Sequence, residues 1–181
     1  KIPDTQIIAV GIGEKESKDS MREAILRGAD EVFFIEKIPN LRYEPLTYAY
    51  ILSEFVKTIE PNLIICGTMS EDYFSSSTHI FISEILKWPV ITNVINIREI
   101  TSNSALVERK RENDIETYEL ILPAIICVTN GIIQLKTITP VQIMRIPRDK
   151  IKSIEISKTS NFLTAESLAI IPIVTKQRRK I

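Results

Sequence analysis

Glycine, histidine and cysteine are all scarce in this chain, which has five glycines, one histidine and two cysteines among 181 residues. A lone histidine without partners at metal-ligand spacing does not predict a zinc site, so we expect His79 on the surface of a helix. It also has no neighbouring carboxylate pattern that would orient a general base. Cys66 and Cys127 stand far apart, each within an apolar run. We therefore expect two core thiols rather than a disulfide or a metal pair.

Net charge is also lacking, because 23 basic residues balance 23 acidic ones. This balance gives no general attraction to nucleic acid or to an anionic membrane. A basic group near the end, from Lys176 to Lys180, is expected to be a solvated tail. No run is long and apolar enough to span a bilayer, and no signal peptide opens the chain. These absences predict a cytoplasmic protein that does not insert into a membrane.

Strand and helix patterns alternate through the first half of the chain. Short apolar runs predict strands at residues 6–12, 31–35 and 63–66. Helical periodicity predicts helices at 14–27, from Pro45 onward and at 77–86, and Gly28 is expected to end the first. This alternation predicts parallel strand pairing with helices on both faces of the sheet.

The second half begins with strands that no helix separates, at residues 90–97, 105–110 and 116–122. Residues 112–114 give a turn signal, and the charges around it predict an exposed antiparallel ribbon. A fully apolar strand at 125–128 and a short helix from Pro140 to Met144 follow. From Pro147 onward there is no clear period, which predicts an extended arm. Residues 168–174 are too apolar for a free tail, so the arm should pack on another protein.

The predicted fold is therefore α/β, with three α/β/α layers. Its sheet is expected to be mostly parallel and Rossmann-like, with an antiparallel hairpin extension. Residues 1–147 should form a nucleotide-binding-like domain, and residues 148–181 should form a C-terminal arm that packs on a partner subunit.

The loop after the strand at 63–66 is the most informative segment. It begins at Gly67, carries hydroxyl groups from Thr68 to Thr78, and leads into a helix. The carboxyl end of a strand in an α/β protein is where nucleotides bind, and free amides at a helix start suit a phosphate. Glu71 and Asp72 fit two interpretations equally: they hold a magnesium ion or a ribose, or they simply favour the start of the helix.

A second strand-to-helix turn, Gly11-Ile12-Gly13, resembles the beginning of a dinucleotide fingerprint. The third glycine of that motif is missing, since Glu16 holds its place. Glu14 and Glu16 would also repel a pyrophosphate. A tight turn whose backbone lies near a ligand is the favoured interpretation.

Several segments together resemble the β subunit of electron transfer flavoproteins. They are IIAVGIG, then MREAILRGADEVFFIE, then PNLIICG with its acidic loop, helix and LKWP, then ETYELILPAIICVTN, then ITPVQIM. Their order and spacing are more specific than any single piece, and they run from about Gln6 onward.

The resemblance implies a subunit that is not itself an enzyme. In this family the α subunit carries most contacts to the redox-active FAD. The β subunit shields that flavin, buries an AMP or, in the electron-bifurcating type, a second FAD, and offers a loop to acyl-CoA or other flavin dehydrogenases. The implied cofactor-binding residues are Ala9, Gly11, Ile12, Cys66, Gly67, Met69, Ser70, Asp72, Ser75, Ser76, Ser77 and Thr78. The implied dehydrogenase-recognition residues are Phe162 and Leu163.

This sequence also departs from the family pattern. In the nucleotide loop Gly67 and Asp72 survive, but His79 replaces the glycine whose backbone approaches a phosphate. Of the family's Asn-x-Pro-Arg-Tyr patch near the flavin, only a positive charge remains, at Lys136. Residues 1–5 resemble the family's Lys-x-Val-Pro-Asp-Thr, which comes just after its first strand, and the segment that usually follows, with an Asn-Pro nucleotide contact, is absent before Gln6. Either it was lost, or further residues separate Thr5 from Gln6, which we favour because loss would expose a parallel sheet edge.

The residues leave two alternatives to the flavoprotein subunit. The hydroxyl-rich loop alone would suit a stand-alone adenine-nucleotide-binding module. The loss of glycine at His79 would suit a diverged structural subunit that binds no nucleotide. An enzyme is the class least supported, since no constellation supplies paired catalytic groups.

Overall fold

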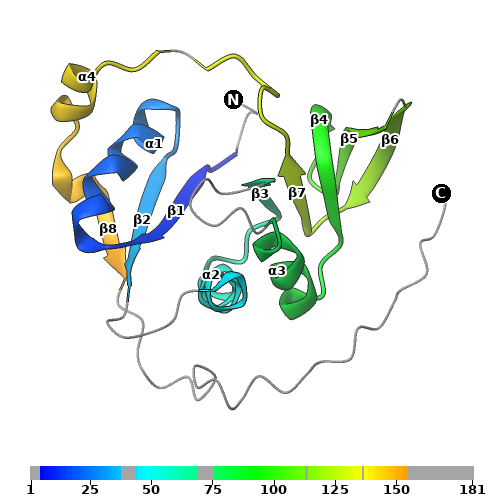
Figure 1. The fold of residues 1–181 in the computed structure, drawn as a ribbon, viewed down its shortest axis with the longest axis horizontal. Helices are drawn as coiled ribbons and strands as arrows, with labels where there is room; N and C mark the ends of the chain where they lie inside the picture. The colour runs from blue at the N-terminus through cyan, green and yellow to red at the C-terminus, as the bar shows by residue number, and fades with distance from the viewer. Residues whose placement is uncertain (1–4, 38–43, 69–75, 113, 136, 155–181) are drawn as a thin grey trace.

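Two β-sheets and the helices that cover them make up the described part of this computed structural model, which comprises residues 5–37, 44–68, 76–112, 114–135 and 137–154 (Figure 1). The strands are β1 (Ile8–Gly13), β2 (Glu31–Glu36), β3 (Leu63–Gly67), β4 (Val90–Ile100), β5 (Ser104–Arg111), β6 (Asp114–Ile121), β7 (Ala124–Val128) and β8 (Ile151–Ile154). The α-helices are α1 (Arg22–Leu26), α2 (Pro45–Ile59), α3 (Thr78–Leu86) and α4 (Pro140–Arg145), with 3-10 helices at Lys15–Met21 and Arg148–Lys150.

The first sheet has the strand order β1-β2-β8, and both pairings are parallel. One face packs against the 3-10 helix and α1, where Met21 and Ile25 meet the buried Val32 and Phe34. The helix expected at 14–27 is thus 3-10 in its first half, and Gly28 ends it with a φ of +105°, which glycine adopts without strain. The expectation that residues after Pro147 lack regular structure is wrong for β8, which pairs with β2.

The second sheet has the order β3-β7-β4-β5-β6. Strands β3, β7 and β4 are parallel, and β5 and β6 form the antiparallel hairpin extension that the sequence predicts. The mostly parallel α/β fold is therefore confirmed. The parallel strands are nevertheless divided between two sheets, and no strand pairing joins these sheets within the described residues.

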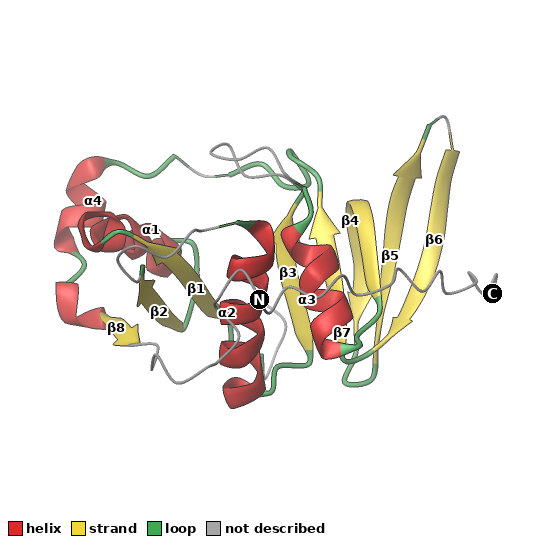
Figure 2. Cartoon of the chain, turned by 60° about the horizontal axis from the view of Figure 1, so that its bottom comes forward, coloured by secondary structure: helices red, strands yellow, loops and turns green. Residues whose placement is uncertain are grey.

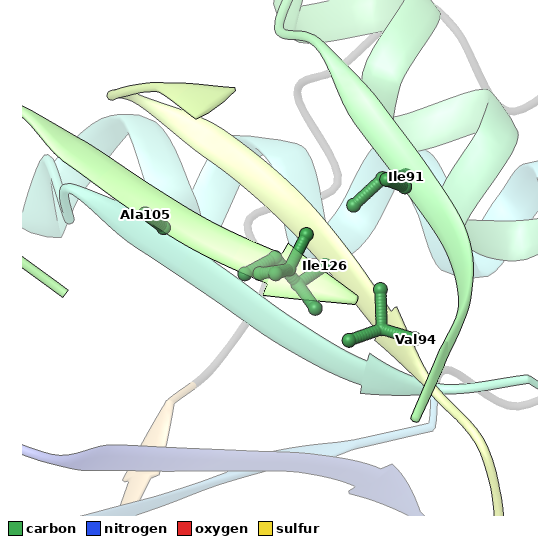
Figure 3. Close-up of a cluster of buried hydrophobic side chains, with 5 residues drawn as sticks. Ile91, Val94, Ala105 and Ile126 are labelled. Carbon is green, nitrogen blue, oxygen red and sulfur yellow. The ribbon is translucent and has the colours of Figure 1, made fainter. Parts of the chain in front are cut away.

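The two faces of the second sheet have different partners. On one face, Ile125 packs against α2 and α3, through Ala49 and Ile82. On the other face, an apolar cluster forms among the strands themselves (Figure 3): Ile91, Val94, Ala105, Val107 and Ile126. The sequence predicted an exposed ribbon that is mostly charged on both faces. This prediction is wrong for the first half of β5, where Ala105 and Val107 are fully buried. The outer half is exposed at Lys110 and Arg111, as expected.

Helix α2 lies between the two sheets, as two views show (Figures 1 and 2). Its Ile51 and Phe55 pack against the first sheet, next to Ile35. Its Ala49 packs against the second sheet, next to Ile125. Pro45 begins the helix at a position where the missing N–H costs nothing, and Glu60 ends it in a left-handed conformation. The sequence predicted one buried face, whereas two faces of this helix are buried.

We predict that Phe55→Ala lowers the free energy of unfolding by about 3–5 kcal/mol, as expected for an aromatic side chain lost from a core. Phe55 is 6% exposed and its ring centroid lies 5.2 Å from that of Phe33. Urea unfolding of the full chain, followed by circular dichroism, measures the change. The control is Lys57→Ala on the exposed side of α2, which should cost no more than about 0.5 kcal/mol. Equal effects of the two substitutions would contradict the packing of α2.

We predict that Ser53→Ala raises the unfolding free energy by about 1 kcal/mol. Ser53 in α2 is completely buried, and its hydroxyl has no hydrogen-bond partner among the described residues. Removing a desolvated, unpaired hydroxyl relieves a cost, and alanine is also the better helix former. The matched control is Ser83→Ala, which should destabilise, because the Ser83 hydroxyl donates to the Trp88 carbonyl oxygen at 2.7 Å. A loss of stability in Ser53→Ala would show that this hydroxyl has a partner.

Candidate functional site

The candidate site lies where β3 ends and α3 begins. Gly67 is the last residue of β3, and Thr78 is the first residue of α3. Ser77 takes the N-cap position, but its side chain makes no capping hydrogen bond. Ser76 before it is exposed and has a left-handed φ of +43°. The start of α3 is therefore left without the side-chain cap that a serine normally provides, which suits an anionic ligand there.

Gly67 faces open space. A Cβ atom built at this position would meet no atom of the described residues within 4 Å. Gly67 is also exposed, although it ends a strand whose other residues include core positions. Since no internal packing requires glycine here, its small size leaves room beside the backbone for a group from outside the chain.

Three of the predicted cofactor contacts, Ala9, Gly11 and Ile12, lie in β1 of the first sheet. They are packed against other parts of the chain. Ala9 packs toward α1, and Ile12 packs toward α2. A Cβ atom at Gly11 would lie 2.6 Å from the sulfur of Met21, so this position is closely packed against the chain's own 3-10 helix. These three residues could offer a ligand only their backbone. They lie in the first sheet, whereas Cys66 and Gly67 lie in the second.

Several other predicted positions lie outside the described residues. They are Met69, Ser70, Asp72 and Ser75 of the loop, and Phe162 and Leu163 of the arm. Their proposed roles stay predictions.

His79 brings a feature that the sequence interpretation missed. It is 6% exposed, so the expectation of a surface histidine is wrong. It lies on the same side of α3 as the buried Ile82, one turn further along, and this side faces the sheet. The spacing of His79, Ile82 and Leu86 was the available signal, since it places the histidine on the apolar stripe.

The two cysteines, expected to be separate core thiols, are neighbours in the sheet. Cys66 of β3 pairs in register with Cys127 of β7. The Cys127 sulfur lies 3.7 Å from His79 Nδ1 and donates to the Gly67 carbonyl oxygen at 3.1 Å. Cys66 is half-buried and Cys127 is fully buried. The matching strings LIICG and AIICV, each with cysteine before the strand end, were the signal that could have predicted this pairing.

These contacts change the acidity of the two thiols in opposite directions. A hydrogen bond from Cys66 lowers the pKa of Cys127 to about 5, and the His79 ring lowers it further against the opposing effect of burial. The same hydrogen bond and burial raise the pKa of the Cys66 thiol. The contacts thus favour the thiolate of Cys127 over that of Cys66.

A groove of about 440 Å³ lies at the opposite end of β3. Its lining includes Pro61, Asn62, Trp88 and Pro123, at the amino ends of the strands and the end of α3. Ligands of open α/β sheets bind at the carboxyl ends instead. We assign this groove no role.

Comparison with known proteins agrees with the resemblance seen in the sequence. Residues 1–157 match the family model described as the electron transfer flavoprotein domain. A protein of Dictyostelium discoideum named electron transfer flavoprotein subunit beta is 36% identical over 121 residues, which cover 67% of this chain and 47% of that protein. The chain thus spans about half the length of this relative. Among the described residues, no helix has the length and apolar character needed to cross a membrane. The chain belongs to the electron transfer flavoprotein family, and within that family its sequence is of the β-subunit type.

Proposed function

We propose that this chain works as the β subunit of an electron transfer flavoprotein, in an αβ heterodimer that carries electrons from acyl-CoA or other flavin dehydrogenases. The observation that supports this most is the family match over residues 1–157 together with the similarity to a named β subunit. The FAD is held mainly by the α subunit, and the chain works in the cytoplasm. The role of the chain is positional: it shields the flavin and supplies no acid, base or nucleophile.

A set of exposed apolar side chains supports a partner surface. They follow β7 and continue into α4, and their exposed fractions range from 59% to 76%: Ile133, Leu135, Val141 and Met144. Large apolar side chains gathered in one segment mark a protein interface more often than a free surface. We infer that this segment contacts the α subunit, and that the part of the 148–181 arm that follows β8 continues the contact, with Phe162 and Leu163 offered to a dehydrogenase.

A structural nucleotide, AMP or a second FAD, is proposed at the start of α3. Gly67 leaves open space beside its backbone, and Ser77 leaves the helix start uncapped by a side chain. Both features fit a phosphate group, which binds backbone N–H groups at a helix start. Thr78 and the serines before it would add hydroxyl groups to a ribose or phosphate.

One observation favours a second candidate function, a subunit of the same fold that binds no nucleotide. The family glycine at position 79 is replaced by a histidine that turns inward and is 6% exposed. Its backbone lies in the first turn of α3, and its side chain takes part in the core. A stand-alone adenine-nucleotide-binding module would instead retain nucleotide without any α subunit.

We predict that the full chain co-expressed with the α subunit of the same organism purifies as a complex with flavin absorbance. The chain expressed alone should show no flavin, because the α subunit supplies most of the FAD contacts. Leu135→Asp should weaken the complex, since it places a charge in the proposed apolar interface. Lys110→Asp on the exposed end of the ribbon is the control and should leave the complex intact. Absence of any complex with the α subunit would contradict the proposed function.

We predict that Gly67→Val removes most of the bound nucleotide and leaves the fold unchanged. A Cβ atom at this position meets no atom of the described residues within 4 Å, and valine suits a strand, so the new side chain should fill the space proposed for the ligand. Nucleotide released by denaturing the purified complex is identified and quantified by chromatography. Gly11→Ala is the comparison: its Cβ atom would displace the end of the Met21 side chain, without acting on the ligand directly. Full nucleotide content in Gly67→Val would contradict this placement.

A further inference from the structure

Three elements direct one sulfur or nitrogen ligand each to a common point. Cys66 comes from the end of β3, Cys127 from its neighbour β7, and His79 from the first turn of α3, which packs on the same face of the sheet. Their ligand atoms all lie within 4.8 Å of one another. Each side chain is held by a regular element, so the arrangement does not depend on a loop.

The spacing of these atoms fits a tetrahedral metal. Bond lengths of about 2.3 Å to sulfur and about 2.0 Å to nitrogen place two ligands of one zinc ion about 3.5–3.8 Å apart. The Cys127 sulfur and His79 Nδ1 are 3.7 Å apart, which already matches. The remaining pairs, at no more than 4.8 Å, need a side-chain shift of only about 1 Å to reach this range.

We propose that Cys66, His79 and Cys127 bind one thiophilic divalent cation of the Zn²⁺ type. Two thiolates and a neutral imidazole cancel the charge of such a cation, which is the arrangement that burial favours. On binding, each thiol loses its proton to solvent and forms a metal–sulfur bond. No electron is transferred. A water molecule completes the tetrahedron on the side of Cys66, the half-buried ligand.

The site explains why a polar ring lies in this core. Buried histidine needs a hydrogen-bond partner, and the partner of this ring among the described residues is the Cys127 sulfur, at the long distance of 3.7 Å. A bond from the His79 nitrogen to a metal ion would be far stronger than this long hydrogen bond to sulfur.

A disulfide between the two cysteines explains less of this three-residue arrangement than a metal ion does. It would use two of the three groups and leave the imidazole buried with no partner, which is costly. A reactive cysteine–histidine pair fits the structure no better. The Cys127 side chain is fully buried, whereas a reactive cysteine has to be accessible to its substrate. The metal site depends on neither the flavin nor the nucleotide, and its test uses neither.

The test is a titration of the full chain, carrying no histidine tag and kept reduced, with Co²⁺ as a spectroscopic probe. We expect one Co²⁺ per chain, with sulfur-to-cobalt absorption and tetrahedral visible bands that Zn²⁺ abolishes by displacement. Zn²⁺ should also raise the unfolding temperature. Cys66→Ala, Cys127→Ala and His79→Gln should each lose the tetrahedral bands and the Zn²⁺-dependent rise in unfolding temperature. Circular dichroism establishes that each variant is folded.

Ile82→Val is the matched control, since it alters packing on the same side of α3 without removing a ligand. It should bind Co²⁺ like the unaltered chain. The proposal is overturned if the reduced chain takes up no Co²⁺, if the double variant Cys66→Ala/Cys127→Ala retains the bands, or if Cys66 and Cys127 form a disulfide in the presence of Zn²⁺. None of these results depends on whether the chain binds the α subunit.

Discussion

The packing of α2 between the two sheets is the constraint on which the rest of this structure depends. No strand pairing joins the sheets in the described residues, so apolar contacts must hold them together. Phe55 and Ile51 face one sheet while Ala49 faces the other. Each fully buried aliphatic or aromatic side chain contributes about 1.5–3 kcal/mol, so this helix supplies a large share of the net stability. It also supports α3, whose first turn forms one side of the candidate site.

The sequence predicted the positions of the helices and strands better than it predicted which strands pair with one another. Apolar runs and helix-start signals located β1, β2, β3, β7 and α2 to within a few residues, because burial on both faces leaves a strong pattern. The strand Ile151–Ile154 was missed, since a four-residue strand at a sheet edge has too little periodicity to detect. The division into two sheets was missed for a different reason: periodicity identifies a strand, but pairing depends on contacts that are distant in sequence.

At the candidate site, too, contacts between residues distant in sequence could not be predicted from the sequence. The position of Gly67 at the end of β3 and the start of α3 near residue 78 follow from motif position along the chain, and were expected. The side chain of His79 was not, because a single histidine in a polar sequence context resembles a surface residue. Only the register of Cys66 with Cys127 and the inward side of α3 bring the three groups together. The residue that departs most from the family pattern therefore has a structural explanation within this chain.

The central claim is that open space beside Gly67, at the start of α3, belongs to a ligand of an electron transfer flavoprotein. An experimental structure of the chain in complex with its α subunit tests this most directly. We predict electron density for a nucleotide phosphate against the Gly67 backbone and the Ser77–Thr78 amides, with the flavin held by the α subunit. Protein side chains filling the space beside Gly67, from either subunit, would contradict it.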